Sequence, residues 1–400
     1  MLKKGADIIS PARVFGFIWS IVLGLANLKL SKLQFPWTFS QWAYVLIGPL
    51  SFLIGIFIIY IMYIGSRLHS VSEIRQILGE QKVDHTKLFY LIVLAFILYL
   101  IGYIGVALAK GQVPMFSRNP SAARTDFLVF GIAMFIPNMT VILFFSLVYH
   151  LFTQQMSTKK GLLKIISFIT IISYLFLLQR YQFILITVMA FTFLYYTSRY
   201  IRLKTMFLFA ILGILLFYLI ATLRSGQIIQ LALYKTSLMK FSFKYAIFTE
   251  PYMYVVMNVE NFVNAVSRHD HFTYGAYTFD WLFALIQLKY PIKDYFALVD
   301  TPYTIGVFNT HTIFWTFYRD FGILGISLLP LICGLAVGSV YYSMRRNPTI
   351  GLVSSYSIIV FVMALSFFIN PLGFLWFVYI IAWIVIVLKF IRVKQSVLVP

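Results

Sequence analysis

The stretch Trp42–Ile64 reads WAYVLIGPLSFLIGIFIIYIMYI and contains no charged residue. A transmembrane helix needs about 20 consecutive, mainly apolar residues, so this stretch is long enough to cross a bilayer. A second uncharged run, LFYLIVLAFILYLIGYIGVALA, follows at Leu88–Ala109. Two such runs early in the chain predict a membrane protein whose main solvent is lipid.

The composition of the whole chain supports this class. Hydrophobic residues make up 61% of the 400 residues and charged residues only 11%, whereas a soluble domain carries about 25% charged residues. The net charge of +20 fits basic loops that orient membrane helices, so no nucleic-acid partner is expected. A single cysteine, Cys333, excludes an internal disulfide framework.

Further apolar runs predict an all-α, polytopic helix bundle with about ten transmembrane helices. The candidate spans are residues 13–28, 42–64, 88–109, 127–150, 162–178, 182–197, 205–222, 323–342, 350–369 and 374–390. Lys3 and Lys4 precede the first run as in a signal peptide, but no small-x-small cleavage site follows. An uncleaved first helix is therefore expected.

The basic residues predict the orientation. More than half of the 32 Lys and Arg residues lie in the termini and in four segments that are cytoplasmic when both termini are: 65–87, 152–161, 198–204 and 343–349. The chain then divides into helices at 1–222, a large outer loop at 223–322 and helices at 323–400. This arrangement predicts a multi-pass protein of the cytoplasmic membrane.

One segment allows two topologies. Residues 162–178 and 182–197 form either a tight hairpin with Arg180 at the outer surface or one long helix with Arg180 in mid-membrane. Basic clusters at 159–164 and 199–204 favour the hairpin, because both ends are then cytoplasmic. The long helix would move everything downstream to the other side.

The outer loop has the composition of folded structure. It holds more than half of the 12 acidic residues and half of the six histidines. Thr249–Pro251 is typical of a helix start, with Thr249 as the capping hydroxyl. Apolar residues then recur at three- and four-residue steps to Val266, leaving a polar face that includes Asn258, Glu260 and Asn261. The pattern predicts an amphipathic helix that lies on the membrane or on the helix bundle.

Four arginines stand near the outer ends of the predicted spans: Arg118, Arg124, Arg180 and Arg224. The positive-inside rule disfavours such positions, so each needs a reason. Contact with lipid phosphates is one explanation. The other is that they converge, since the forked guanidinium group suits phosphate and pyrophosphate.

A second polar group begins with Asn309–Thr312 and continues through Trp315 to Tyr318-Arg319-Asp320. In a helix, His311, Trp315 and Arg319 share one face at four-residue steps. This arrangement suggests an outer site with His311 for proton transfer. The alternative is an interfacial turn with a hydrogen-bonded histidine. Other candidate bases are Glu250, Glu260, Asp280, Asp294 and Asp300.

Several familiar ligand motifs are missing from the sequence. There is no phosphate-binding lysine loop of the Walker type, no dinucleotide glycine run and no Asp-x-Asp pair. His269-Asp270-His271 lacks a nearby third ligand, so exposed loop histidines are expected there rather than a metal site. A synthetic reaction at the outer face would need a donor that is already activated and held in the membrane.

Short stretches of the sequence are similar to one family. They are Val113–Phe116 with Arg124, Arg180 in a short hairpin, Arg224, and Asn309–His311 leading to Asp320–Gly325. Together with the late outer loop, they resemble the bacterial O-antigen and capsule repeat-unit polymerases of the Wzy type. The related O-antigen ligases carry a similar histidine, but here Asn309 precedes it by two residues instead of adjoining it.

The resemblance implies a fold like that of the GT-C glycosyltransferases, with no metal and no cofactor. It implies that an undecaprenyl-diphosphate-linked oligosaccharide is polymerised, on the periplasmic face of the inner membrane, toward lipopolysaccharide or another envelope polysaccharide. Membrane lipid and a chain-length regulator protein are the implied partners. His311 would act as base beside the catalytic Arg180 and Arg224. The implied substrate-binding residues are Arg118, Arg124, Asn309, Tyr318, Arg319 and Asp320.

Two other functions remain open. A glycan ligase would use the same kind of site with another acceptor. A flippase or other transporter of lipid-linked oligosaccharides is expected to carry charged residues inside its spans. The predicted spans are almost free of charge, which favours chemistry at the outer surface.

Overall fold

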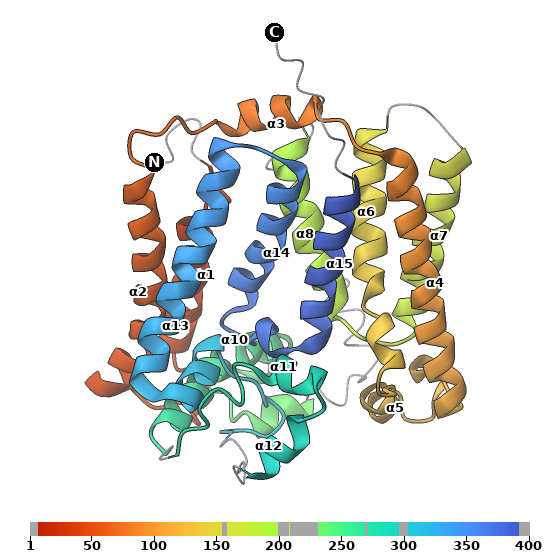
Figure 1. The fold of residues 1–400 in the computed structure, drawn as a ribbon. Helices are drawn as coiled ribbons and strands as arrows, with labels where there is room; N and C mark the ends of the chain where they lie inside the picture. Colours follow the sequence, from red (N-terminus) through yellow and green to blue (C-terminus); the bar gives the residue numbers. More distant parts are fainter. Residues whose placement is uncertain are drawn as a thin grey trace. The chain divides into compact units, whose positions relative to one another are not determined.

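A computed structural model describes residues 7–153, 158–198, 208, 231–268, 271–295 and 303–391. Within these residues the chain is helical and contains no β-strand, only an isolated bridge between Ser31 and Met239 (Figure 1). The longer helices are α1 (Pro11–Asn27), α2 (Phe39–Met62), α3 (Val71–Gly79), α4 (His85–Lys110), α6 (Asn138–Phe152), α7 (Thr158–Leu175), α8 (Tyr181–Thr197), α10 (Thr249–Val266), α13 (Ile313–Arg346), α14 (Ile350–Leu365) and α15 (Leu375–Ile391). The shorter ones are η1 (Pro114–Phe116), α5 (Pro120–Asp126), η2 (Ile132–Phe135), η3 (Phe243–Phe248), α11 (Asp280–Leu285), α12 (Lys289–Tyr295) and η4 (Pro371–Gly373). The all-α expectation is confirmed for this part of the chain.

The chain forms two compact units that are each assembled from distant segments. Unit 1 comprises Met1–Leu68, Gly226–Arg346 and Ile359–Leu375. Unit 2 comprises His69–Ser225, Asn347–Ile358 and Trp376–Pro400. These units differ from the predicted division at 222 and 322, because helices from both ends of the sequence pack together within each unit.

Unit 1 is organised around the close pairing of α2 with α13 (Figure 1). Two glycines allow the backbones to meet: a Cβ atom added to Gly55 would lie 2.3 Å from the Leu331 carbonyl oxygen, and one added to Gly334 would lie 2.1 Å from that of Phe52. Small residues at a helix contact maximise van der Waals packing, which is the main attraction between helices in lipid.

Helix α13 changes direction at Gly322, where φ is 61° and ψ is −142°. Residues 313–321 form a first helical segment, and the second begins where the predicted span 323–342 begins. The left-handed φ favours glycine, and a Cβ atom here would lie 2.8 Å from the Phe272 ring. The break therefore separates the polar Trp315–Asp320 segment from the apolar helix.

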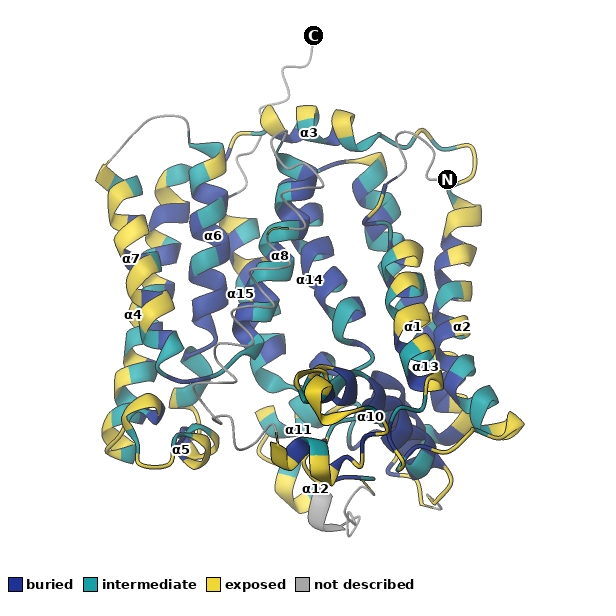
Figure 2. Cartoon of the chain, turned by 180° about the vertical axis from the view of Figure 1, so that it is seen from behind, coloured by how far each residue is buried: buried dark blue, intermediate teal, exposed yellow. Residues whose placement is uncertain are grey.

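Helix α10 is buried on both its apolar and its polar sides (Figure 2). It packs against α1, α2 and α13, so of the two expected positions the structure shows the one on the helix bundle. The predicted start at Thr249 is confirmed, but the predicted cap is wrong. The 3₁₀ helix η3 leads directly into α10, and the Thr249 side chain makes no capping hydrogen bond.

In unit 2, α4 packs beside α6 and η2 (Figure 1). The predicted span 127–150 becomes helical later than expected, because Gly131 has a left-handed φ of 80° and Pro137 caps α6. Helices α7 and α8 are separated by a turn in which Leu178 has a φ of 55°. The single long helix through Arg180 is therefore excluded.

Among the described residues, four helical segments are long and apolar enough to cross a membrane: Phe39–Met62, His85–Phe116, Ile132–Phe152 and Ile313–Arg346. Shorter apolar helices occur at Pro11–Asn27, Tyr181–Thr197, Ile350–Leu365 and Leu375–Ile391. The predicted span 205–222 lies outside the described residues except for Leu208. A helical membrane protein is supported, and the count of about ten spans stays a prediction.

Two glycine substitutions, one inside the α2–α13 contact and one outside it, test how close that contact is. Gly334→Ala should lower stability by about 1–3 kcal/mol, because its methyl group overpacks the contact with the Phe52 carbonyl. Gly24→Ala, on α1 with no atom within 4 Å of the added Cβ, should leave stability unchanged or raise it slightly. Thermal unfolding of the detergent-solubilised protein measures both. Equal melting temperatures would contradict the close contact.

Candidate functional site

In unit 1, the polar face of α10 holds the segment that leads to His311. The Asn261 amide nitrogen donates to the carbonyl oxygens of Phe308 at 2.7 Å and Thr310 at 3.0 Å, and its oxygen accepts from the Thr304 amide at 3.0 Å. The Thr310 hydroxyl donates to Asn258. The two asparagines therefore replace missing backbone partners in an irregular segment.

Four aromatic rings and one guanidinium group form a stack beside this segment. The His311 ring centroid lies 4.9 Å from that of Tyr303 and 5.3 Å from that of Trp315. The Arg319 guanidinium carbon lies 5.8 Å from the Trp315 ring centroid and 4.0 Å from that of Tyr277. Guanidinium groups bind aromatic faces through the ring quadrupole. The predicted His311, Trp315 and Arg319 face is present, with His311 just before the helix.

The surroundings keep His311 neutral. Burial, and secondly the positive charge of Arg319, lower the pKa of His311 to about 3. Both ring nitrogens are enclosed, and neither has a hydrogen-bond partner among the described residues. At neutral pH the imidazole is therefore uncharged and only weakly basic.

Asp320 anchors the loop that carries Tyr277. Its fully buried carboxylate accepts hydrogen bonds from the amides of Tyr277 at 3.2 Å and Thr278 at 2.6 Å, and from the Thr273 hydroxyl. The Asp320 carbonyl oxygen accepts from the Tyr274 amide at 3.1 Å. This carboxylate thus fixes the loop that covers Arg319, rather than facing an open site.

The other candidate carboxylates differ in the hydrogen bonds and ion pairs that they form. The Glu260 carboxylate accepts hydrogen bonds from the side chains of Lys29 at 2.5 Å, Gln34 at 3.0 Å and Trp37 at 2.9 Å. Burial lowers the pKa of Lys29, and the Glu260 carboxylate opposes that shift. Asp280 pairs with Lys289 at 2.7 Å.

Among the remaining candidate bases, Glu250 is half-buried near the start of α10. The Asp294 side chain and Asp300 lie outside the described residues.

In unit 2, two of the four predicted arginines belong to segments that pack together. The Met115 amide donates to the Phe176 carbonyl at 3.0 Å, and the Phe116 and Phe176 ring centroids lie 5.2 Å apart. These contacts join the loop before Arg124 to the turn before Arg180.

Each of these arginines is partly enclosed. The Nε atom of Arg124 and one terminal nitrogen of Arg180 are shielded from solvent. The charge of Arg124 acts on the Tyr174 hydroxyl, which donates to Gln179 in the turn at 3.0 Å. Burial strengthens the field that a guanidinium exerts on a bound anion.

The remaining predicted residues have other placements. Arg118 and Asn309 are exposed, and Tyr318 is buried with its ring centroid 5.7 Å from that of Tyr44 on α2. Arg224, His269 and Asp270 lie outside the described residues. The part of the chain that the structure describes holds no group of three metal-ligating side chains.

Sequence reasoning missed Tyr277 and Tyr303, which lie 34 and eight residues before His311 and have no spacing that singles them out. It also missed that Asn258 and Asn261 hold the 304–310 segment, although the polar face of α10 was a usable signal.

Comparisons with protein-family models, with curated proteins and with solved structures find no match. The function must therefore be argued from the residues themselves.

The Asp320 contacts predict a local loss of structure on neutralising the side chain. Asp320→Asn should destabilise the protein by about 1.5–3 kcal/mol, because an amide cannot accept all the bonds that the carboxylate accepts. The amides of Tyr277 and Thr278 should exchange hydrogen faster. Asp126→Asn, at an exposed carboxylate paired with Lys110, is the control. Unchanged exchange in Asp320→Asn would refute the anchoring role.

The low pKa of His311 predicts an acid-side loss of stability. Between its unfolded value of 6.5 and its folded value of about 3, the unfolded chain binds a proton that the folded chain does not. Stability from this group is therefore full above pH 6.5 and falls as the pH drops toward 3, by at most about 1.4 kcal/mol per pH unit.

Melting temperature against pH measures the effect. His311→Gln should flatten the acid side of the curve, whereas His271→Gln, at an exposed position, should not. Parallel curves for the parent protein and His311→Gln would contradict the buried neutral imidazole.

Proposed function

We propose that this chain is a glycosyltransferase that polymerises lipid-linked oligosaccharide repeat units in the bacterial cytoplasmic membrane, with its site facing outward. It would transfer a growing glycan from undecaprenyl diphosphate to a sugar hydroxyl of the next lipid-linked unit. The observation that carries the proposal is the packing of the Arg124 loop against the Arg180 turn in unit 2.

Partly enclosed guanidinium groups suit the leaving group of such a reaction. A diphosphate carries several negative oxygens, and bidentate Arg contacts match their geometry. The negative charge on the bridging oxygen grows as its bond to the sugar breaks. Arg180 and Arg124 would stabilise that charge, and Arg224 remains a predicted third member.

The ring stack of unit 1 would bind sugar. Tyr303 is 38% exposed and forms the open end of the stack, and Asn309 of the same segment is also exposed. Neither ring nitrogen of His311 has a hydrogen-bond partner in the described part of the chain, so each would be available to a sugar hydroxyl that enters the stack. Arg319, Tyr318 and Asp320 would act by holding this stack in place.

The proposed step exchanges one carbon–oxygen bond for another. The anomeric carbon–diphosphate bond breaks with its electron pair leaving on the diphosphate, while the acceptor oxygen bonds to the anomeric carbon. The acceptor proton passes to the departing diphosphate. Because the pKa of His311 is about 3, we assign this residue to orienting the hydroxyl rather than to holding the proton. The step uses no metal and no cofactor.

Two alternative functions would give other results in an activity assay. A ligase would transfer the glycan to a different acceptor, and a flippase would move the lipid-linked unit without joining sugars. Each of the four long apolar segments in the described part of the chain includes a stretch of 18 residues with at most two charged residues, which supports surface chemistry over translocation.

Arginine variants test the proposed activity. Purified protein is incubated with undecaprenyl-diphosphate-linked repeat units in the presence of a chelator, and the products are separated by size. Arg180→Ala should lower the polymerisation rate by about 10²–10³-fold and leave single repeat units. Lys110→Ala, which removes an exposed pair with Asp126 in the same unit, should polymerise normally. Equal ladders from parent and Arg180→Ala would overturn the arginine assignment, and no polymer from the parent would favour the transporter.

A further inference from the structure

A polar pocket of about 210 Å³ lies in unit 1, where the start of α1 meets the end of α13. Its charged and hydroxyl-bearing walls include Asp7, Ser10, Arg13, Tyr341 and Arg345. The ring stack begins at the opposite end of α13, so the two sites are separated by the length of that helix.

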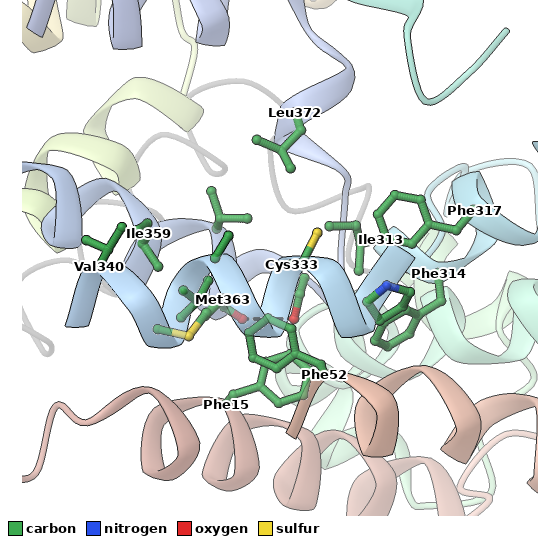
Figure 3. A pocket seen from close by; sticks show the side chains of 15 residues that line it. Phe15, Phe52, Ile313, Phe314, Phe317, Cys333, Val340, Ile359, Met363 and Leu372 are labelled. Atoms are coloured by element: carbon green, nitrogen blue, oxygen red, sulfur yellow. Dashed lines mark hydrogen bonds between the residues drawn. The ribbon is translucent and has the colours of Figure 1, made fainter. Parts of the chain in front are cut away.

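The pocket is also distinct from an apolar cavity along the middle of α13. Figure 3 shows that cavity, with Phe314 toward one end and Val340 toward the other. None of the residues that line it is charged. The charged side chains therefore gather beyond Val340, at the C-terminal end of α13.

The carboxylate of Asp7 builds the pocket. One of its oxygens accepts from the Ile9 amide at 3.0 Å, and the other accepts from the Tyr341 hydroxyl at 2.8 Å and from Arg345 at 3.3 Å. The Asp7 side chain is only 3% exposed. Because both oxygens already accept hydrogen bonds from the protein, this carboxylate fixes the segment before α1 onto α13 and is a poor ligand for a cation.

The lining carries an excess of positive charge. Two arginines face one carboxylate, which leaves one positive charge in excess. The contact between Arg345 and Asp7 uses a single terminal nitrogen of the guanidinium group. Arg13 is exposed and donates to the Asp7 carbonyl oxygen at 2.7 Å, an acceptor without net charge. The pocket therefore favours an anion.

The hydrogen-bond donors suit a phosphate group in particular. Forked guanidinium groups match the oxygens of phosphate. Ser10 is the N-cap residue of α1, yet its side chain makes no capping hydrogen bond, so its hydroxyl can donate to a further oxygen. Ser10 and Arg13 also stand at the N-terminal end of a 17-residue helix, whose dipole favours negative charge.

Both parts of the pocket come from segments that are predicted on the same side of the membrane. The positive-inside rule assigns the N-terminus and residues 343–349 to the cytoplasm, and the structure brings Asp7–Arg13 against the end of α13. Basic pockets between helices on this side bind the head groups of anionic lipids. Such a head group has the charge and the location that the pocket requires.

We propose that this pocket binds a phosphate group, supplied either by an anionic phospholipid of the cytoplasmic leaflet or by a soluble phosphate. Arg13, Arg345 and the Ser10 hydroxyl donate to its oxygens. Binding holds the start of α1 against the end of α13 and so stabilises unit 1. The proposal is independent of the glycosyltransferase activity proposed above.

Thermal unfolding of the purified full chain in detergent tests the proposal and separates the two sources. One arm adds phosphatidylglycerol, with phosphatidylcholine at the same mole fraction as its control. The other adds inorganic phosphate, with chloride at the same ionic strength. The melting temperature should rise with ligand concentration in one of the arms, and that arm identifies the source. No rise over the control in either arm would overturn the proposal.

Two substitutions at Ser10 separate binding from folding. Asp and Asn are both good N-cap residues, so Ser10→Asp and Ser10→Asn should melt close to the parent protein without ligand. Ser10→Asn should keep the response to the ligand. Ser10→Asp places a negative charge in the pocket and should raise the dissociation constant about tenfold or more. Equal responses from the two variants would show a general effect of the additive on stability and overturn the pocket.

A second pair of variants compares two neighbouring arginines. Arg13→Gln should weaken binding about tenfold, because it removes a charged donor from the pocket. Arg346→Gln removes the same charge from an exposed position that does not line the pocket, and should bind as the parent does. Native mass spectrometry measures the bound phosphatidylglycerol, or the bound phosphate, in each variant. Equal losses in both would indicate a diffuse surface charge and contradict the proposed site.

Discussion

The carboxylate of Asp320 is the constraint on which the rest of the unit 1 site depends. It accepts hydrogen bonds from two backbone amides and one hydroxyl group of residues 273–278, and so ties an irregular loop to α13. Because that loop carries Tyr277, the carboxylate also determines what lies over Arg319. Burial makes each of these hydrogen bonds costly to lose. A charged group in this place therefore acts as a structural anchor for the stack.

Burial within this stack also determines the chemistry that His311 can perform. A buried imidazole beside a guanidinium group stays neutral, because both surroundings disfavour its charged form. It keeps two hydrogen-bonding nitrogens and loses most of its basicity. Arginines behave differently, since they remain charged when buried. Arginine groups therefore suit negative charge, whereas the neutral imidazole of His311 suits uncharged hydrogen-bonding partners.

The residues at the candidate site were only partly predictable from the sequence. The four-residue steps of His311, Trp315 and Arg319 correctly indicated one face, because helical periodicity is a local property. Nothing local indicated Tyr277, which reaches the stack through long-range folding, or Tyr303, which lies eight residues before His311 in an irregular segment with no regular spacing. The expected roles of Asp320 and of the Thr249 hydroxyl depended on their neighbours. The Asp320 carboxylate accepts hydrogen bonds from backbone amides. The Thr249 hydroxyl follows the 3₁₀ helix η3, which leads directly into α10, so the helix needs no side-chain cap there.

The sequence by itself determined the solvent of this protein and its helical class, because runs such as Trp42–Ile64 have only one way to satisfy their backbone in lipid. It also indicated the turn between α7 and α8 through the basic clusters at 159–164 and 199–204, the two ends that the hairpin places in the cytoplasm. Only the tertiary structure decided which helices pair. The α2–α13 contact needs Gly55 opposite Leu331 and Gly334 opposite Phe52, and such a match between distant positions leaves no periodic trace in either segment.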